Sequence, residues 1–132
     1  MFRIDKETKD IYCTRGDRGT IRLKNTTDES GLFNINDKFK FSIVEKNNYG
    51  NVLFQKEYVV LEAADTFDIT LTEEDTRFYE IISRDTHFNY EIEYNGDNTI
   101  IGYHEYTNER GRVKYTAPEF ILLPEAAEEE VQ

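Results

Sequence analysis

Two short stretches of the sequence alternate strictly between apolar and polar residues, and this period of two is the feature that most restricts the fold. In residues 38–43, Lys-Phe-Lys-Phe-Ser-Ile, every second side chain is large and apolar. Residues 88–94, Phe-Asn-Tyr-Glu-Ile-Glu-Tyr, repeat the pattern. Successive side chains of a β-strand point to opposite faces of its sheet, so each stretch predicts a strand with one face in the core and one in water.

Weaker patterns predict further strands at residues 11–14, 20–24, 51–60, 67–71, 99–106 and 119–123. Small and polar residues typical of turns separate them at 16–19, 26–31, 47–51 and 95–98. This spacing of strands and turns is typical of an antiparallel β-sandwich or barrel. Lys56 interrupts the apolar face of 51–60, which predicts an edge strand or a β-bulge there.

Residues 73–83 depart from the strand pattern. Thr72 and Asp75 have the spacing of a capping box, in which two residues bond each other's backbone amides. Phe78 and Ile81 then follow at helical spacing, with Ile82 beside them. The sequence therefore predicts one short helix near residues 73–83, closing an end of the sandwich.

The length of 132 residues fits one domain with one core. We expect the sandwich domain to span residues 1–124 and residues 125–132, which hold four glutamates, to form a flexible acidic tail. The large side chains predicted to face the core are Ile21, Leu23, Phe39, Phe41, Ile43, Val52, Phe54, Ile69, Leu71, Phe78, Tyr90, Ile92, Ile100, Phe120 and Leu122.

The charge balance and the cysteine content bear on partners and compartment. Sixteen basic and 27 acidic side chains give a formal charge of −11, which opposes binding to nucleic acid. No apolar run is long enough to cross a membrane, and the charged start of the chain lacks the pattern of a secretory signal. Cys13 is the only cysteine, so no internal disulfide forms, which is typical of proteins made in a reducing cytoplasm.

Residues suited to catalysis are few. His87 and His104 are the only histidines, and no serine lies in a Gly-x-Ser-x-Gly context. Cys13 is interpreted as a small core residue. Glu91, Glu93 and Glu105 leave open a small hydrolase that uses paired carboxylates, but the strand pattern also explains Glu91 and Glu93 as a wet face. The sequence predicts a protein that is not an enzyme.

No cofactor or metal is expected. A zinc site needs several Cys or His ligands, which the chain lacks. Residues 73–75 and 95–98 offer oxygen ligands for calcium, but neither segment has the alternating pattern of a calcium loop. A solvated helix start and a plain hairpin turn explain the two segments equally well.

Tyr103, Tyr106 and Tyr115 lie in less regular segments and are candidates for an interface. Tyrosine is favoured in interfaces between proteins and also stacks on sugars. A carbohydrate-binding sandwich is therefore the alternative function. Tyrosines at the rim of the core would fit the same pattern.

Residues 15–17, Arg-Gly-Asp, form the tripeptide that adhesion receptors of animal cells recognise on some extracellular proteins. Gly16 and Gly19 permit positive φ, and Asp17 can accept hydrogen bonds from nearby backbone amides. We interpret Arg15, Gly16, Asp17 and Gly19 as a structural turn between the first two predicted strands.

Several segments, taken in order, resemble the amino-terminal domain of upper-baseplate and related tail proteins from phages and prophages of Gram-positive bacteria. The matching segments run over nearly the whole chain and are residues 10–12, 14–19, 33–37, 38–43, 53–57, 71–76, 89–92, 99–101 and 120–122.

This resemblance implies an immunoglobulin-like antiparallel β-sandwich that assembles with other phage tail or baseplate proteins, or with itself as a homo-oligomer. It implies a location in the bacterial cytoplasm during assembly and in the virion tail afterwards. Two departures stand out. Residues 102–118 are longer than the family's usual connection, which predicts an extra hairpin or loop, and family members commonly continue into a larger receptor-binding part.

Overall fold

The computed structural model describes residues 1–25, 31–81, 83–101, 104–107, 113–116 and 118–125, with residues 49, 97–101, 104–107 and 113–116 described by their backbone alone. Its elements are β1 (Phe2–Ile4), β2 (Ile11–Thr14), β3 (Gly19–Lys24), β4 (Lys38–Glu45), β5 (Asn48–Val59), β6 (Thr66–Leu71), the 3-10 helix η1 (Asp75–Arg77), β7 (Thr86–Tyr94), β8 (Asp97–Ile101), β9 (His104–Thr107), β10 (Val113–Thr116) and β11 (Glu119–Leu123).

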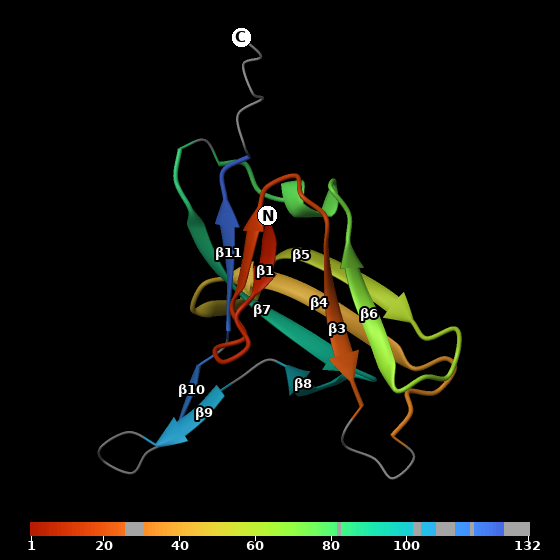
Figure 1. The fold of residues 1–132 in the computed structure, drawn as a ribbon. Coiled ribbons are helices and arrows are strands. Elements are labelled where there is room, and N and C mark those ends of the chain that lie inside the picture. The colour runs from red at the N-terminus through yellow and green to blue at the C-terminus, as the bar shows by residue number, and fades with distance from the viewer. Residues whose placement is uncertain (26–30, 82, 102–103, 108–112, 117, 126–132) are drawn as a thin grey trace.

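The strands form a two-layered sandwich (Figure 1). One sheet has the order β1-β2-β11-β7-β4-β5, with β8 also paired to β7, and the second consists of β3 and β6. β4, β7 and β11 correspond to strands C, F and G of an immunoglobulin fold, β5 to the added strand C′, and β3 and β6 to B and E. The expected all-β sandwich is confirmed.

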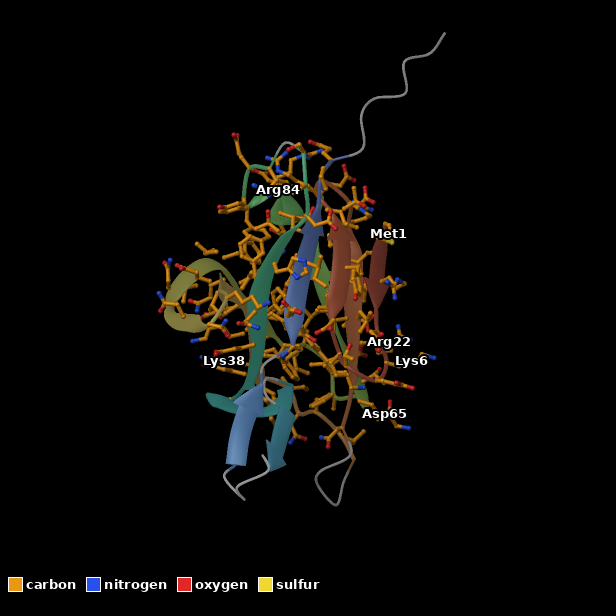
Figure 2. The ribbon with its side chains drawn as sticks, turned by 90° about the vertical axis from the view of Figure 1, so that its left-hand side faces the viewer. Met1, Lys6, Arg22, Lys38, Asp65 and Arg84 are labelled. Atoms are coloured by element: carbon orange, nitrogen blue, oxygen red, sulfur yellow. The ribbon has the colours of Figure 1, made fainter. Side chains whose placement is uncertain are left out.

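One strand pair departs from the expected antiparallel arrangement. β2 and β11 run parallel, with Ile11 opposite Phe120 and Thr14 opposite Leu123. Parallel neighbours need a long connection, and here nearly the whole domain connects the two strands. Figure 2 shows β11 between β2 and β7, with charged side chains such as Lys6 and Arg84 at the periphery.

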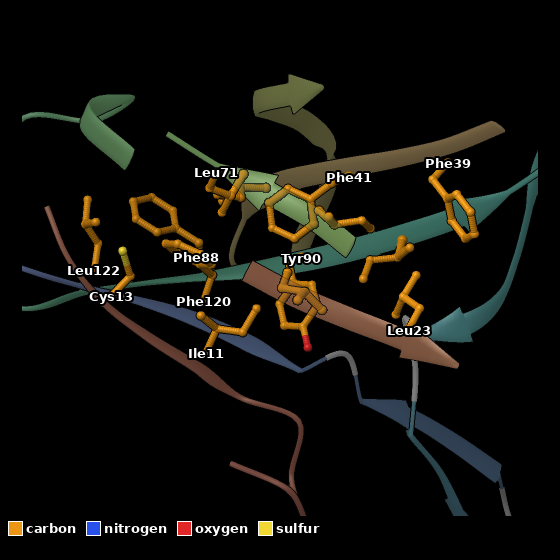
Figure 3. Packing of buried hydrophobic residues seen from close by; sticks show 14 of the residues in the cluster. Ile11, Cys13, Leu23, Phe39, Phe41, Leu71, Phe88, Tyr90, Phe120 and Leu122 are labelled. Carbon is orange, nitrogen blue, oxygen red and sulfur yellow. The ribbon is translucent and has the colours of Figure 1, made fainter. Parts of the chain in front are cut away.

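The core lies between the two sheets, where Phe41, Tyr90 and Phe120 pack beneath β3 and β6 (Figure 3). Most of the predicted core is confirmed as buried, including both alternating stretches. Phe54 and Phe78 are partly buried and pack against the core, while the side chain of Ile100 is outside those described. Cys13, interpreted from the sequence as a small core residue, is fully buried. Buried apolar residues absent from the predicted core are Ile11, Phe33, Val44, Val60, Phe88 and Ile121.

Val52 was wrongly predicted to face the core. The pairing of β4 with β5 shifts between Ile43 and Val44, so that Ile43 lies opposite Phe54 but Val44 lies opposite Val52. This bulge turns Val52 to the outer face, where it is 47% exposed. The edge strand and the bulge predicted from Lys56 are both present in β5.

The outer face of β4 and β7 is only partly exposed to solvent. Lys40 and Glu93 are half-buried there, and Lys40 Nζ lies 3.1 Å from Glu93 Oε2. Ser42 and Asn89, also polar members of the alternating pattern, are buried. The tip of the β4–β5 hairpin reaches across this face, because the Asn47 amide donates to Asn89 Oδ1 at 2.9 Å.

The short helix is a single 3-10 turn. Thr72 and Asp75 form the predicted capping box, with the Asp75 amide donating to Thr72 Oγ1 and the Thr72 amide to Asp75 Oδ2. The helix ends at Arg77, so the helical spacing read through Ile81 was wrong. Phe78 instead turns into the aromatic cluster, 5.3 Å from Phe88 between ring centroids.

The long segment 102–118 contains the expected extra hairpin. β9 and β10 pair antiparallel as a separate two-stranded sheet, with Val113 opposite Thr107. The strand predicted at 99–106 is therefore divided between β8 and β9. The turn before β8 is a two-residue Asn95-Gly96 turn with φ of 49° and 86°, which is typical of a tight hairpin.

Candidate assembly surfaces

The Arg-Gly-Asp segment is the connection between β2 and β3, at the end of the sandwich that also carries η1. Gly16 has φ +90°, and the Asp17 amide donates to the Thr14 carbonyl at 3.0 Å. Thr76 of η1 holds the turn from inside: its hydroxyl accepts from the Gly16 amide at 3.0 Å and donates to the Asp17 carbonyl at 2.8 Å.

The side chains of the turn are engaged within the molecule. Arg15 is only 16% exposed, and its Nε donates to the Tyr79 carbonyl at 2.8 Å. The Asp17 carboxylate pairs with the N-terminal ammonium group of Met1. A Cβ added to Gly19 would lie 2.1 Å from the Phe2 ring. These contacts favour the structural-turn interpretation, because a receptor ligand must present its Arg and Asp to solvent.

Of the residues weighed for catalysis, His87 and Cys13 have surroundings that serve the fold, while the side chains of His104 and Glu105 are outside those described. His87 Nδ1 lies 3.2 Å from Glu119 Oε1, and Lys46 Nζ lies 2.8 Å from the same oxygen. Burial would raise the pKa of Glu119, but the hydrogen bonds and charges of Lys46 and His87 outweigh it and lower that pKa. Burial raises the pKa of Cys13 to about 11, so its thiol stays protonated and unreactive at neutral pH.

The oxygen-rich segments serve the fold. Asp75 Oδ2 accepts from Lys56 Nζ at 2.7 Å and from the Thr72 amide at 2.8 Å, so this carboxylate supports the capping box. Asn95 Oδ1 accepts from the Lys38 amide at 2.8 Å. Across the described ranges, no three His, Cys, Asp or Glu side chains gather as a metal ion would require.

The tyrosines proposed for an interface lie at the edge of what the structure describes. Tyr103 lies outside the described residues, and Tyr106 and Tyr115 belong to β9 and β10. Tyr106 is paired with Lys114 and Tyr115 with Glu105, so these two tyrosines occupy register positions on opposite faces of the hairpin. Loss of glycan-array binding on Tyr103→Ala or Tyr106→Ala remains the test of the carbohydrate alternative.

An exposed apolar surface lies at the end of the sandwich where β5 finishes and β6 begins. Leu61 is 84% exposed, Ile35 59% and Val59 45%; we call these three residues the apolar corner. The backbone brings them together, because the Asn36 amide donates to the Val60 carbonyl at 2.9 Å and the segments pair again at Phe33 and Ala64. The sequence patterns missed this corner, since Ile35 and Leu61 lie in irregular segments.

The apolar corner adjoins an open sheet edge. β5 has 12 residues and ends the large sheet, and no other described strand pairs with its outer side. Long open edges are templates for pairing with another chain. The charges nearby are mainly negative, with exposed carboxylates at Glu57, Glu62 and Asp65 and an exposed Lys38 opposite Val59.

Comparisons with protein-family models, with curated proteins and with solved structures find no match to this chain. Within the part of the chain that the structure describes, no helix has the length and apolar character needed to cross a membrane.

Proposed function

We propose that the chain is a non-enzymatic assembly module of a phage or prophage tail baseplate, and that it binds another tail protein through the apolar corner and the adjoining edge of β5. The observation that carries this proposal is the exposure of Leu61, Ile35 and Val59 beside a 12-residue open edge. The sequence resemblance to upper-baseplate proteins gives the biological setting. Its place of action is the bacterial cytoplasm during assembly and the virion tail afterwards.

Burial of the apolar corner against a partner would favour binding. Grouped apolar side chains that face water mark interaction sites, and each large one contributes about 1.5–3 kcal/mol when it is fully buried. Leu61 has the largest exposed fraction of the three and therefore has the most apolar surface to bury against a partner. Backbone hydrogen bonds along β5 would add register and orientation to such a contact.

The charge of the surface favours a different protein over a second copy. Pairing two copies through this corner would bring Glu57, Glu62 and Asp65 close to the same residues of the partner, and like charges oppose each other. The formal charge of −11 adds to that repulsion. The partner that fits carries an apolar group flanked by Lys or Arg.

Prophage induction in the strain that carries the gene tests this function. The gene is deleted, and the strain is complemented with the unaltered protein, with Leu61→Asp or with Thr20→Asp. Phage particles from each strain are then purified and probed with an antibody against the chain. We expect the chain in particles with the unaltered protein and with Thr20→Asp, an exposed control on β3, and its loss with Leu61→Asp. Complete tails that never contain the unaltered chain would refute the proposal, and equal incorporation of both variants would refute the corner.

A further inference from the structure

Two arginines from different elements converge on one carboxylate at the end of the sandwich opposite the apolar corner. Arg15 Nη1 lies 3.0 Å from Glu125 Oε2, while Arg77 donates to Glu125 Oε1 from Nη2 at 2.6 Å and from Nε at 3.1 Å. Both oxygens of the carboxylate are therefore bound. Glu125 was expected to begin a flexible tail, but it is held against the sandwich; residues 126–132 lie outside the described residues.

The fold positions Arg15 without help from Glu125. Its Nε donates to the Tyr79 carbonyl, and its backbone amide donates to the Leu123 carbonyl at 2.9 Å. The residue is thus held at its backbone and at Nε, and its Nη1 is left to contact Glu125. A guanidinium group held this way is pre-organised for a carboxylate.

Arg77 is positioned by η1. Thr76, its neighbour, is buried and bonded to the Arg-Gly-Asp turn, which fixes the distance between the helix and Arg15. Glu73 and Glu74 of the same region also act on Arg77 through their charge, and they weaken its attraction for an incoming anion. The site therefore suits a ligand that engages both arginines at once.

Glu125 is bound but replaceable. Its side chain is 41% exposed and that of Arg77 42%, so water and solutes reach the contact. Exposed ion pairs contribute little to stability, because water and salt screen them. The advantage of Glu125 is that it belongs to the same chain, which gives it a high effective concentration.

We propose that Arg15 and Arg77 form a carboxylate-binding site in which Glu125 is an exchangeable internal ligand, and that an acidic peptide segment of a partner occupies the site when Glu125 leaves. This site lies apart from the apolar corner and is a second binding surface. In this site the arginine of the Arg-Gly-Asp turn binds a carboxylate of another segment. It is not itself displayed as a ligand for a receptor.

Binding of a defined peptide to Glu125→Gln tests the proposal. The probe is acetyl-Leu-Pro-Glu-Ala-Ala-amide, which copies residues 123–127, and the readout is the NMR signal of the arginine Nε–H groups. We expect saturable shifts of two arginine signals in Glu125→Gln and binding weaker by at least about tenfold in the unaltered chain, where Glu125 competes. The double variant Glu125→Gln, Arg77→Gln should not bind the peptide.

Controls separate this outcome from others. The same peptide with Gln in place of Glu should not bind, and inorganic phosphate reports whether the site accepts any oxyanion. Circular dichroism and urea unfolding establish that each variant is folded. Equal peptide affinity in the unaltered chain and Glu125→Gln would overturn the internal-ligand claim. Absence of binding to folded Glu125→Gln, or binding of phosphate without the peptide, would overturn the carboxylate site.

Discussion

Thr76 shows how one buried hydroxyl joins two loops. It is 1% exposed, accepts from the Gly16 amide and donates to the Asp17 carbonyl, so it supplies hydrogen-bond partners for two backbone groups of the turn. The turn and η1 are about 60 residues apart in the sequence, and no local pattern predicts this contact.

We expect Thr76→Val to lower the free energy of unfolding by about 1–3 kcal/mol, because the substitution keeps the volume but leaves the Gly16 amide without its acceptor. Urea unfolding followed by circular dichroism measures the change. Thr76→Ser, which retains the hydroxyl, is the matched control and should lose less. A Thr76→Val protein as stable as the unaltered one would show that water or another group satisfies the turn.

We expect Gly16→Val to lower the free energy of unfolding more than Arg15→Ala does. Gly16 has φ +90°, a conformation that a β-branched residue rarely adopts, and an added Cβ would lie 2.6 Å from Glu125 Oε1 and 2.8 Å from Arg77 Nη2. Arg15→Ala removes one ion pair with the partly exposed Glu125 and one hydrogen bond to a carbonyl, and it leaves the backbone of the turn unstrained. Chemical denaturation of both variants decides the order, and the reverse order would contradict the structural-turn interpretation.

Glycines were sufficient to predict the turn from the sequence, but its partners were not predictable. Gly16 and Gly19 lie between two apolar runs, which is a local signal. Glu125 binds Arg15 across 110 residues, and such a pairing depends on how the strands are ordered in space. The apolar corner was missed for a related reason: Ile35 and Leu61 come together only when two irregular segments pair.

At the scale of elements, side-chain contacts connect the two sheets between β5 and β6. These strands belong to different sheets, and the Tyr58 hydroxyl donates to the Thr70 carbonyl at 2.6 Å. The Tyr58 ring also packs against Phe67 at 6.2 Å between centroids. Burial, followed by the charge of Asp75, raises the pKa of Tyr58, so the hydroxyl keeps its proton and remains a donor.

We expect Tyr58→Phe to lower the free energy of unfolding by about 0.5–1.5 kcal/mol, the usual contribution of one hydrogen bond. The ring contact with Phe67 is retained, so the loss reports the hydroxyl alone. Tyr79→Phe is the control, because the Tyr79 ring is 40% exposed and packs on Phe88 in the same way before and after the change. Thermal and urea unfolding measure both variants; equal effects would argue against the bridge between the sheets.

Glu119, which pairs with Lys46 at the tip of the β4–β5 hairpin, should make the stability depend on pH. The pKa of Glu119 is lowered in the folded protein, so the contribution of Glu119 to stability is present above the ordinary carboxyl pKa and is lost as the pH falls through the lowered value. We expect the stability lost between about pH 7 and about pH 3 to be smaller in Glu119→Gln than in the unaltered chain. Urea unfolding at several pH values measures this difference. Identical pH profiles would show that Lys46 and His87 do not stabilise the ionised Glu119.

The elements that follow a simple period were predictable, and the others were not. In β4 and β7 the apolar side chains share the face toward the core, which a period of two reports directly, but the burial of Ser42 and Asn89 on the other face was not predicted. β1 has three residues, too few to show a period. The helix prediction gave the capping box correctly but not the helix end: the helix stops at Arg77, and Phe78 packs in the aromatic cluster with Phe88 and Phe120, a long-range contact that helical spacing does not report.

For the molecule as a whole, the excess of negative charge opposes the compact state. The formal charge is −11, and the ion pairs are mostly at the surface, where each is weak. We expect the Tm to rise by a few degrees when NaCl increases from about 20 mM to about 300 mM, because screening reduces long-range repulsion more than it weakens close pairs. Differential scanning calorimetry measures this. A Tm that falls with salt would show that the attractive pairs dominate.

The position of β11 has a consequence for synthesis of the protein on the ribosome. β11 separates β2 from β7, so the nascent chain cannot join β1 and β2 to the rest of the large sheet until residues 119–123 have emerged from the exit tunnel. Until then the apolar side chains of Ile11 and Cys13 lack their neighbours Phe120 and Leu122. The sandwich is therefore completed late, because β1 and β2 join the large sheet only after β11 has been synthesised.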